Sequence, residues 1–335
     1  MPLPLEAMIE QAIGKRVHFL KRFEEEGTSC FRLFHGVAEG LPGLTVDRYG
    51  PLLLVQTRSD VSNLLTTEHI ERIARCVNHA LGDKLLPVWN KRGAPPHAQP
   101  PFDQPGPFVG QELKLFYDVR PRHRGKDPLL FLDFRSVRRW ILRNSKDRSV
   151  LNLFAYTCGV GMCAARGGAR EVWNVDFSKS ALEVAQTNAQ MNGIEITERY
   201  RLIRADVIPT LWQLAGLPVK GRASRREYVR FAPRSFDLVV LDPPRWAKTP
   251  FGAVDVVRDY PTLLKPAMRT IAPSGILIAS NHVPECSRQE FERVIRRTAQ
   301  KVGRQITRFE WIEADEDVPS FDGSHPLKVA CVHLA

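Results

Sequence analysis

The sequence predicts an α/β protein: a mostly parallel sheet with an antiparallel last strand, preceded by a small α+β domain. From Ser149 onward, buried strand patterns alternate with helical patterns, which is typical of a parallel sheet with helices on both faces. The two C-terminal strand patterns, 306–312 and 327–334, have no helix between them, so we expect the last strand to run antiparallel. Residues 92–107 contain six prolines and two glycines, which predicts a surface connection between two domains.

The first domain is expected to span residues 1–91. Apolar residues at three- and four-residue spacing predict one helix over 5–23, which Gly27 can end. Short β-rich runs separated by glycine and proline turns predict strands, and a second helical pattern precedes the last of them. The strands are expected at 31–34, 44–46, 52–56 and 85–89, and the second helix at 67–81.

A proline-rich linker over 92–110 is expected to lead into a second domain over 111–335. This domain is predicted to open with a hairpin whose arms are 112–119 and 129–133. The alternating pattern then predicts strands at 149–154, 172–175, 201–204, 236–241 and 275–280, and helices from about 160 and at 179–191, 259–271 and 287–302.

The net charge indicates a polyanionic partner, with nucleic acid as the first candidate. Among 335 residues, 48 Lys and Arg outnumber 37 Asp and Glu, which leaves a charge of +11. The excess is concentrated in 120–148 and in 220–234, where Tyr228 and Phe231 are interleaved with arginines, a composition that suits phosphates and unstacked bases. Solvated loop charge is the alternative for the second segment.

Cysteine usage and hydropathy predict a cytoplasmic location. The six cysteines have no paired spacing and no secretory leader precedes them, so we expect reduced thiols and no metal site. No stretch approaches the roughly 18 apolar residues that a membrane-spanning helix needs.

A glycine turn after the strand at 149–154 predicts a nucleotide-like ligand. Gly159 and Gly161 fit the loose pattern G-x-G-x-x-A, in which glycines admit a ligand close to the backbone and the following helix offers free amides. The pattern is compatible with NAD, FAD or S-adenosylmethionine, and a purely structural tight turn is the alternative.

Three acidic residues follow successive strands. Asp176 can accept hydrogen bonds from ribose hydroxyls, and Asp206 can meet the exocyclic amine of an adenine. Their alternatives are a helix N-cap, for which Ser178 is the better candidate, and a solvated turn. Asp242 is the third, and the array is expected to lie along one edge of the sheet.

The segment Asp242-Pro243-Pro244-Arg245-Trp246 discriminates best between cofactors. Two prolines fix the backbone just past a buried strand, where carbonyls, a carboxylate and an aromatic ring can face a planar base beside a methyl donor. A nicotinamide enzyme has no need of such a site. Together with the glycine turn, the segment indicates an S-adenosylmethionine-dependent methyltransferase; a turn that merely ends a strand is the alternative.

In order along the chain, these motifs resemble those of the bacterial and archaeal 23S ribosomal RNA large-subunit methyltransferases, the branch with cytosine-C5 and guanine-N7 enzymes. The resemblance implies a Rossmann-like class I methyltransferase domain, S-adenosylmethionine as cofactor and ribosomal RNA as partner. The matching segments are 40–50, 131–135, 153–157, 175–178, 241–244 and 327–331. The cofactor-side residues it implies are Arg135, Phe154, Tyr156, Thr157, Gly159, Gly161, Asp176, Phe177, Asp206, Val207 and Asp242.

The chain departs from the family pattern in three ways. It begins after the place where many members carry a PUA domain, so RNA capture is expected to use the α+β domain and the basic segments, or another protein. Phe134 replaces the usual Gln beside Arg135, whose guanidinium suits the methionine carboxylate or, alternatively, a structural ion pair. Asn281, between Ser280 and His282, stands where cytosine-C5 members have cysteine.

The missing cysteine bears on the mechanism. Methylation of cytosine C5 requires a thiolate to add at C6, and neither position 245 nor 281 is cysteine, whereas Cys158 and Cys286 are interpreted as inert thiols. Guanine N7 has a lone pair and no proton to lose, so direct SN2 transfer suffices. The catalytic residues expected are Asp242, Pro243, Pro244, Arg245 and Asn281, with Asn281 or Arg245 bonded to the guanine edge.

Three alternatives stay open. Within the class, a cytosine-C5 enzyme can use a relocated cysteine. Outside it, a nicotinamide oxidoreductase shares the glycine turn, and a non-catalytic RNA-binding protein can keep the fold without the reaction.

Overall fold

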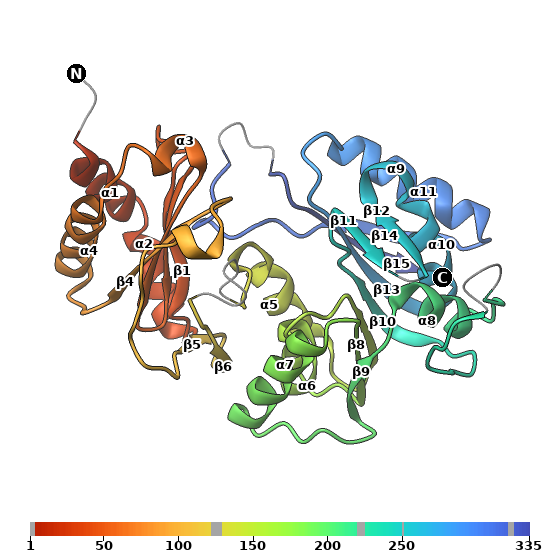
Figure 1. Cartoon of the computed structure of the whole chain (residues 1–335). Helices are drawn as coiled ribbons and strands as arrows, with labels where there is room; N and C mark the ends of the chain where they lie inside the picture. Colours follow the sequence, from red (N-terminus) through yellow and green to blue (C-terminus); the bar gives the residue numbers. More distant parts are fainter. Residues whose placement is uncertain (1–3, 122–128, 220–224, 250, 321–324) are drawn as a thin grey trace. The chain divides into compact units, whose positions relative to one another are not determined.

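A computed structural model describes residues 4–121, 129–219, 225–249, 251–320 and 325–335 (Figure 1). The chain divides into two compact units. The first comprises residues 1–135 and 314–324, and the second comprises 136–313 and 325–335. All six cysteines are free. Within the described residues, every helix is too short or too polar to cross a bilayer.

The first unit is built on a four-stranded sheet in the order β1-β2-β3-β4, antiparallel except for the parallel pair β3–β4. Helix α4 supplies the crossover between β3 and β4, and apolar side chains of α1, α2 and α4 pack on the sheet. The elements are α1 Leu5–Gly14, α2 Val17–Glu25, β1 Cys30–His35, β2 Leu44–Tyr49, β3 Leu52–Thr57, α3 Ser59–Ser62, α4 Thr67–Leu81, β4 Leu86–Lys91, η1 Pro96–Ala98, β5 Val109–Glu112, β6 Leu115–Asp118 and η2 Leu132–Phe134.

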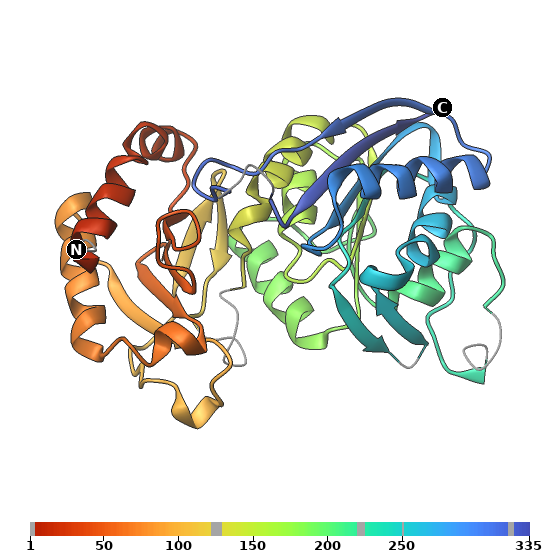
Figure 2. The same ribbon diagram turned by 90° about the horizontal axis from the view of Figure 1, so that it is seen from above.

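The second unit contains a seven-stranded sheet in the order β14-β15-β13-β10-β7-β8-β9. Strands β13, β10, β7, β8 and β9 are parallel, and β15 is antiparallel to both β13 and β14, as predicted. Helices cover both faces (Figures 1 and 2). The elements are α5 Arg135–Asn144, β7 Ser149–Leu153, α6 Gly159–Arg166, β8 Glu171–Asp176, α7 Lys179–Met191, β9 Tyr200–Arg204, α8 Val207–Leu214, β10 Phe236–Leu241, β11 Trp246–Thr249, β12 Gly252–Asp255, α9 Val256–Asp259, α10 Pro261–Arg269, β13 Ile271–Asn281, α11 Arg288–Lys301, β14 Ile306–Trp311 and β15 Lys328–Leu334.

The main core of this unit lies between one face of the sheet and the helices α8, α10 and α11. It joins strand residues such as Leu151, Val239 and Leu277 to Leu211, Leu264 and Ile295 of these helices, all of them buried. The strands that carry the predicted site are therefore held from one side by a continuous apolar layer.

The unit boundaries differ from the predicted domains at 1–91, 92–110 and 111–335. The expected linker lies inside the first unit, where β5 is bonded to the loop before β1: the Ser29 amide donates to Gln111 O at 2.7 Å and the Gln111 amide to Ser29 Oγ at 3.0 Å. Segment 314–324, which follows β14, also belongs to the first unit. Composition alone does not show such a return of the chain.

Two local predictions were wrong, and some elements were missed. The helix over 5–23 is two helices, since the chain turns at Lys15 and Arg16, and the buried Arg16 guanidinium pairs with Glu39. The first hairpin joins β5 and β6 through Leu113 and Lys114, which both have positive φ, rather than 112–119 and 129–133. Residues 132–134 instead form η2, which leads into α5. Helix α8 and the hairpin β11–β12 were not predicted.

Candidate functional site

The parallel strands bring the predicted site residues of the second unit to one edge of its sheet. The turn after β7, Asp176 at the end of β8, Asp206 just after β9, Asp242 just after β10 and Asn281 at the end of β13 all lie at the carboxyl ends of neighbouring strands. Open α/β sheets bind ligands at this edge. The predicted one-sided array is therefore present.

The turn between β7 and α6 has an unusual backbone. Phe154, Tyr156 and Cys158 have φ values of 58°, 50° and 61°, which residues other than glycine rarely adopt. Each such residue costs on the order of 1–3 kcal/mol and persists only when neighbours enforce it. Here the Tyr156 amide donates to Asp176 Oδ2 at 2.8 Å, and Asn188 Nδ2 donates to Thr157 O at 3.3 Å.

The N-terminus of α6 offers free amides beside this turn. Its first internal bond runs from the Met162 amide to Cys158 O at 2.9 Å, and the N-cap residue Cys158 supplies no side-chain acceptor. The amides of Gly159, Val160 and Gly161 therefore point out of the helix, at its positive end. Such a terminus suits a carboxylate or a phosphate.

Gly161 is required for packing rather than for the approach of a ligand. A Cβ atom there would overlap with the side chain of Asn174 on β8. Asn174 is fully buried, and its Oδ1 accepts a hydrogen bond from Asn152 Nδ2 at 2.9 Å, so it has no room to move. Packing against Asn174 is therefore a reason for glycine at 161 that the sequence did not show, and its place beside the cofactor stays a prediction.

Asp176 is buried and holds two turns together. Its Oδ2 accepts from Tyr156, and its Oδ1 accepts from the Ser178 amide at 2.8 Å. Burial raises the pKa of the carboxyl, although the amides of Ser178 and Tyr156 oppose the shift. The N-cap of α7 is Ser178, whose Oγ accepts from the Ala181 amide at 3.3 Å, as the sequence suggested. Asp176 retains a further lone pair on each oxygen for a ligand.

Asp206 carries an unfilled acceptor. Its Oδ1 caps α8 by accepting from the Ile208 amide at 2.9 Å, while its buried Oδ2 has no hydrogen-bond partner among the residues that the structure describes. The Thr249 hydroxyl lies close to Asp206 and donates to Gly252 O at 3.1 Å. Burial raises the pKa of Asp206 against the effect of Thr249 and Ile208. A buried carboxylate oxygen without a donor matches a ligand that brings an N–H group.

The segment after β10 holds a partly buried carboxylate, Asp242, and an exposed cation, Arg245. The Ser280 hydroxyl donates to Asp242 Oδ1, which ties the end of β10 to β13. Pro243 is buried, whereas Arg245 is exposed and forms an ion pair with Glu285 at 3.0 Å. An exposed pair of this kind contributes little to stability, so the guanidinium can exchange partners at little cost.

Asn281 is buried and begins a turn whose contact with Lys328 the sequence did not show. Its Oδ1 accepts from the Val283 amide at 2.9 Å, and the Lys328 ammonium donates to Val283 O at 2.6 Å. Lys328 is 3% exposed, and burial lowers its pKa. The sequence showed Lys328 only as part of a closing strand, because nothing in its spacing indicates that it returns to this edge.

The cysteines closest in sequence to the site are not activated as nucleophiles. Cys158 is fully buried, and burial raises the pKa of its thiol well above the ordinary value. Cys286 is half-buried, and burial raises its pKa as well, against an opposing effect of Lys328. Catalytic thiols show the opposite shift, because the thiolate is the nucleophile.

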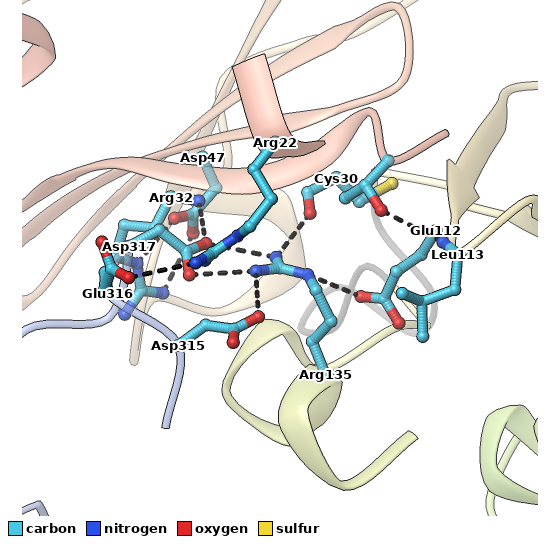
Figure 3. A network of polar contacts seen from close by, with 11 residues as sticks. Arg22, Cys30, Arg32, Asp47, Glu112, Leu113, Arg135, Asp315, Glu316 and Asp317 are labelled. Atoms are coloured by element: carbon cyan, nitrogen blue, oxygen red, sulfur yellow. Dashed lines mark hydrogen bonds and ion pairs between the residues drawn. The ribbon is translucent and has the colours of Figure 1, made fainter. Parts of the chain in front are cut away.

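Arg135 does not bind the cofactor; it is the centre of a buried ionic network in the first unit (Figure 3). Nε donates to Glu112 at 3.1 Å, Nη1 to Asp315 at 3.1 Å and Asp317 at 2.9 Å, and Nη2 to Asp317 at 3.1 Å and Cys30 O at 2.6 Å. Burial alone would lower its pKa, but Asp317 and Glu112 raise it. All five N–H groups are occupied, so the structural ion pair replaces the predicted carboxylate contact.

The basic segment 120–148 also differs from expectation. Arg135 and Arg138 of α5 are buried, so they cannot reach an RNA, and residues 122–128 lie outside the described part of the chain. In the other segment, 220–224 also lie outside it, whereas Arg225, Arg226 and Arg230 are exposed.

One cluster in the second unit has potential metal ligands. Glu310, Cys331 and His333 on β14 and β15 bring one ligand atom each within 4.8 Å of one another. Arg308 pairs with Glu310 at 2.6 Å, and burial raises the pKa of Cys331 to about 12. A cation there would compete with the guanidinium and with a thiol that holds its proton.

The fold and the edge define a transferase or oxidoreductase with an adenosine-containing cofactor. The buried, donor-free oxygen of Asp206 and the free amides of α6 fit such a group. Residues 108–332 match the family model described as S-adenosylmethionine-dependent methyltransferase, so the chain belongs to this family and uses S-adenosylmethionine.

Relatives and solved structures agree with this assignment. A protein of Aeromonas salmonicida named ribosomal RNA large subunit methyltransferase I is 30% identical over 307 residues, covering 88% of this chain and 72% of the relative. One of the same name from Vibrio cholerae is 29% identical over 338 residues, covering 95% and 80%. The fold is similar to that of SMU.776, a methyltransferase solved with SAH, with a TM-score of 0.79, 21% identity and coverage of 99% and 83%. A methyltransferase of Streptococcus mutans gives a TM-score of 0.77 with 20% identity and the same coverage of 99% and 83%.

Proposed function

We propose that this chain methylates large-subunit ribosomal RNA by direct SN2 transfer to a base nitrogen, with guanine N7 as the favoured acceptor. The relatives named as ribosomal RNA methyltransferases and the charge of +11 support RNA as the substrate. The observation that carries direct transfer is the state of the thiols: neither Cys158 nor Cys286 is prepared as a thiolate.

The cofactor is held by the polar groups of the sheet edge. The Asp176 carboxylate accepts hydrogen bonds from the ribose hydroxyls with its free lone pairs. Asp206 Oδ2 accepts a hydrogen bond from the exocyclic amine of the adenine. Phe177, whose side chain is 47% exposed next to Asp176, covers a face of the adenine. Val207 is 2% exposed and is part of the apolar core.

The amino-acid part of the cofactor is held by the turn between β7 and α6. Phe154, Tyr156 and Thr157 form this turn, and the amides from Gly159 onward face a carboxylate. When bound, S-adenosylmethionine supplies an electrophilic methyl group. The strained turn is kept in one conformation by Asp176 and Asn188, which limits the reorganisation that binding requires.

The acceptor base is oriented by the segment after β10. The carbonyls of Asp242 and Pro243, on a backbone stiffened by Pro243 and Pro244, face the edge of the base, and Arg245 or Asn281 donates to it. Because N7 of guanine has a lone pair and no proton, no general base is needed. These residues act by orienting the base and excluding water.

The competing function is cytosine-C5 methylation through a relocated cysteine. Cys286 is the candidate, since it follows the turn of Asn281 and is half-buried rather than sealed. A nicotinamide oxidoreductase is excluded by the family. A chain that binds RNA without catalysis would have no use for the donor-free oxygen of Asp206.

Mass-spectrometric mapping of nucleosides in 23S ribosomal RNA, from cells with and without this gene, tests the proposal. We expect one 7-methylguanosine to be absent from the strain that lacks the gene and to return with the wild-type copy. Loss of a 5-methylcytidine instead would contradict direct transfer to nitrogen, and an unchanged map would contradict the choice of substrate.

A further inference from the structure

Two exposed segments, one before β10 and one after it, meet beside the acceptor segment. One is residues 225–231 of the second basic segment, and the other is the hairpin β11–β12 (Figure 1). The ring of Tyr228 packs edge-on against that of Phe251, with centroids 5.9 Å apart and planes at 89°. We call residues 225–231, 245–249 and 251–252 together the hairpin surface.

The basic half of the hairpin surface is ordered rather than loosely solvated. Gln213 of α8 donates to Val229 O at 2.9 Å and accepts from the Phe231 amide at 3.1 Å. The Phe231 ring packs on Trp173 with centroids 5.7 Å apart. Two specific anchors therefore hold the backbone of this segment, and its exposed side chains stay open either to solvent or to a ligand.

The arginines of this segment are displayed toward solvent. Arg225, Arg226 and Arg230 are exposed, and Glu227 is the acidic residue among them. Arg234, a little further along, is different: it pairs with Glu171 and lies over the ring of Trp173. Arg234 thus has a structural role, whereas the three exposed arginines remain available to a polyanion.

Arg230 and Tyr228 are in cation–π contact at the surface. The guanidinium carbon lies 4.2 Å from the centroid of the Tyr228 ring, and Nη1 donates to the Tyr228 hydroxyl at 2.7 Å. An arginine plane on an aromatic ring is a platform on which an unpaired base can stack.

The hairpin extends the same chemistry to the acceptor segment. Strand alternation puts Trp246 and Lys248 on the exposed side of β11, whereas Ala247 packs on the core. Trp246 is 61% exposed, which is rare for tryptophan without a ligand to cover it. The Val256 amide donates to Arg245 O at 3.1 Å and closes the base of the hairpin directly after Pro244.

We propose that the hairpin surface binds the single-stranded RNA that flanks the methylated base. Trp246 and the Tyr228–Arg230 pair stack on unpaired bases, and Lys248, Arg225 and Arg226 neutralise phosphates. A polyanion is favoured over a protein partner because this surface carries five exposed cations, the exposed Trp246 and the partly exposed Tyr228, with one exposed carboxylate, Glu227. This inference rests on the proposed RNA substrate and adds where on the chain that substrate is held.

Fluorescence anisotropy with a labelled single-stranded RNA 12-mer, and with the same strand in a duplex, tests the surface on the full chain. Trp246→Ala is expected to weaken single-strand binding about tenfold, and Trp246→Phe to restore most of it. Arg226→Ala/Arg230→Ala is expected to lower the salt dependence, with the slope of log K against log salt falling by about 1.4. Lys301→Ala, an exposed cation at the end of α11, is the matched control and should bind as wild type does.

Methyl transfer to ribosomal RNA separates this inference from the proposed function. We expect Trp246→Ala to raise the KM for RNA with the affinity for S-adenosylmethionine unchanged. If the wild type methylates the RNA and the variants bind and react as it does, the surface assignment is overturned while the function stands. Equal affinity for the duplex would also overturn it. If the wild type leaves ribosomal RNA unmethylated yet binds the single strand through Trp246, the function fails and the surface stands.

Discussion

The network around Arg135 and the carboxyl edge of the seven-stranded sheet both hold buried charges, but they are completed differently. Every N–H of Arg135 has an acceptor within the first unit, so nothing is left for a ligand (Figure 3). At the sheet edge, Asp206 Oδ2 is buried without a donor and the first amides of α6 lack a side-chain cap. A buried charged group whose hydrogen bonds are all made within the protein indicates a structural role. A buried charged group with an unfilled donor or acceptor indicates a ligand site.

The largest effect is expected when the complete network is broken. Arg135→Met leaves Glu112, Asp315 and Asp317 without their shared cation in the interior, so the free energy of unfolding should fall by about 3–5 kcal/mol. Chemical denaturation measures this change. Arg143→Met, an exposed arginine of the same helix, is the control and should lie within about 0.5 kcal/mol of wild type. A loss below about 1 kcal/mol for Arg135→Met would show that the network is not what holds this region.

A substitution at Gly161 tests whether this position at the sheet edge is filled by protein packing rather than left for a ligand. Gly161→Ala forces a methyl group into Asn174, and such overpacking costs about 1–3 kcal/mol of unfolding free energy. Gly14→Ala at the end of α1 meets no atom within 4 Å and is expected to be neutral or stabilising by up to about 1 kcal/mol. Thermal denaturation compares the two. Equal stability of both variants would return Gly161 to a role in ligand approach.

The buried carboxyls predict opposite pH dependences for binding and stability. Burial raises the pKa of Asp176 and Asp206, and their ionised forms accept the cofactor's hydrogen bonds. Affinity for S-adenosylmethionine should therefore fall as pH drops through these raised pKa values. A raised carboxyl pKa instead contributes stability below the unfolded pKa, and this is lost as pH rises through the folded pKa. Calorimetric titrations across this range check the binding slope. A flat profile would mean that neither carboxylate contacts the cofactor.

The smallest effect is expected at Cys286. Cys286→Ala should leave the rate of methyl transfer within about twofold of wild type, because its half-buried thiol has a raised pKa and adds to no base. A rate assay with cofactor affinity measured in parallel checks this. Abolished transfer by a folded, cofactor-binding variant would favour the cytosine-C5 alternative.

The sequence predicted the residues at the sheet edge well because buried parallel strands are continuous apolar runs, and each is followed by its candidate site residue. Asp176, Asp206 and Asp242 were located in this way, and Ser178 was recognised as the cap of α7. Local pattern was sufficient wherever the element and the site residue are adjacent in the chain.

Roles that depend on distant contacts were not predictable. Arg135 resembles a ligand-binding arginine until Asp315 and Asp317 arrive from the segment after β14, about 180 residues later. Lys328 and Val283 likewise meet only in the folded chain. The hairpin β11–β12 was missed because its first strand directly follows the site segment and has few β-branched residues.

Asp206→Asn is the most direct test of the claim that the incomplete group is the functional one. Asparagine caps a helix as well as aspartate does, so α8 should be retained and the melting temperature should not fall. The amide, however, cannot present acceptors on both sides, and the affinity for S-adenosylmethionine measured by calorimetry should fall at least about tenfold, the loss of one buried hydrogen bond of roughly 1.4 kcal/mol. Unchanged affinity together with an unchanged melting temperature would contradict the account.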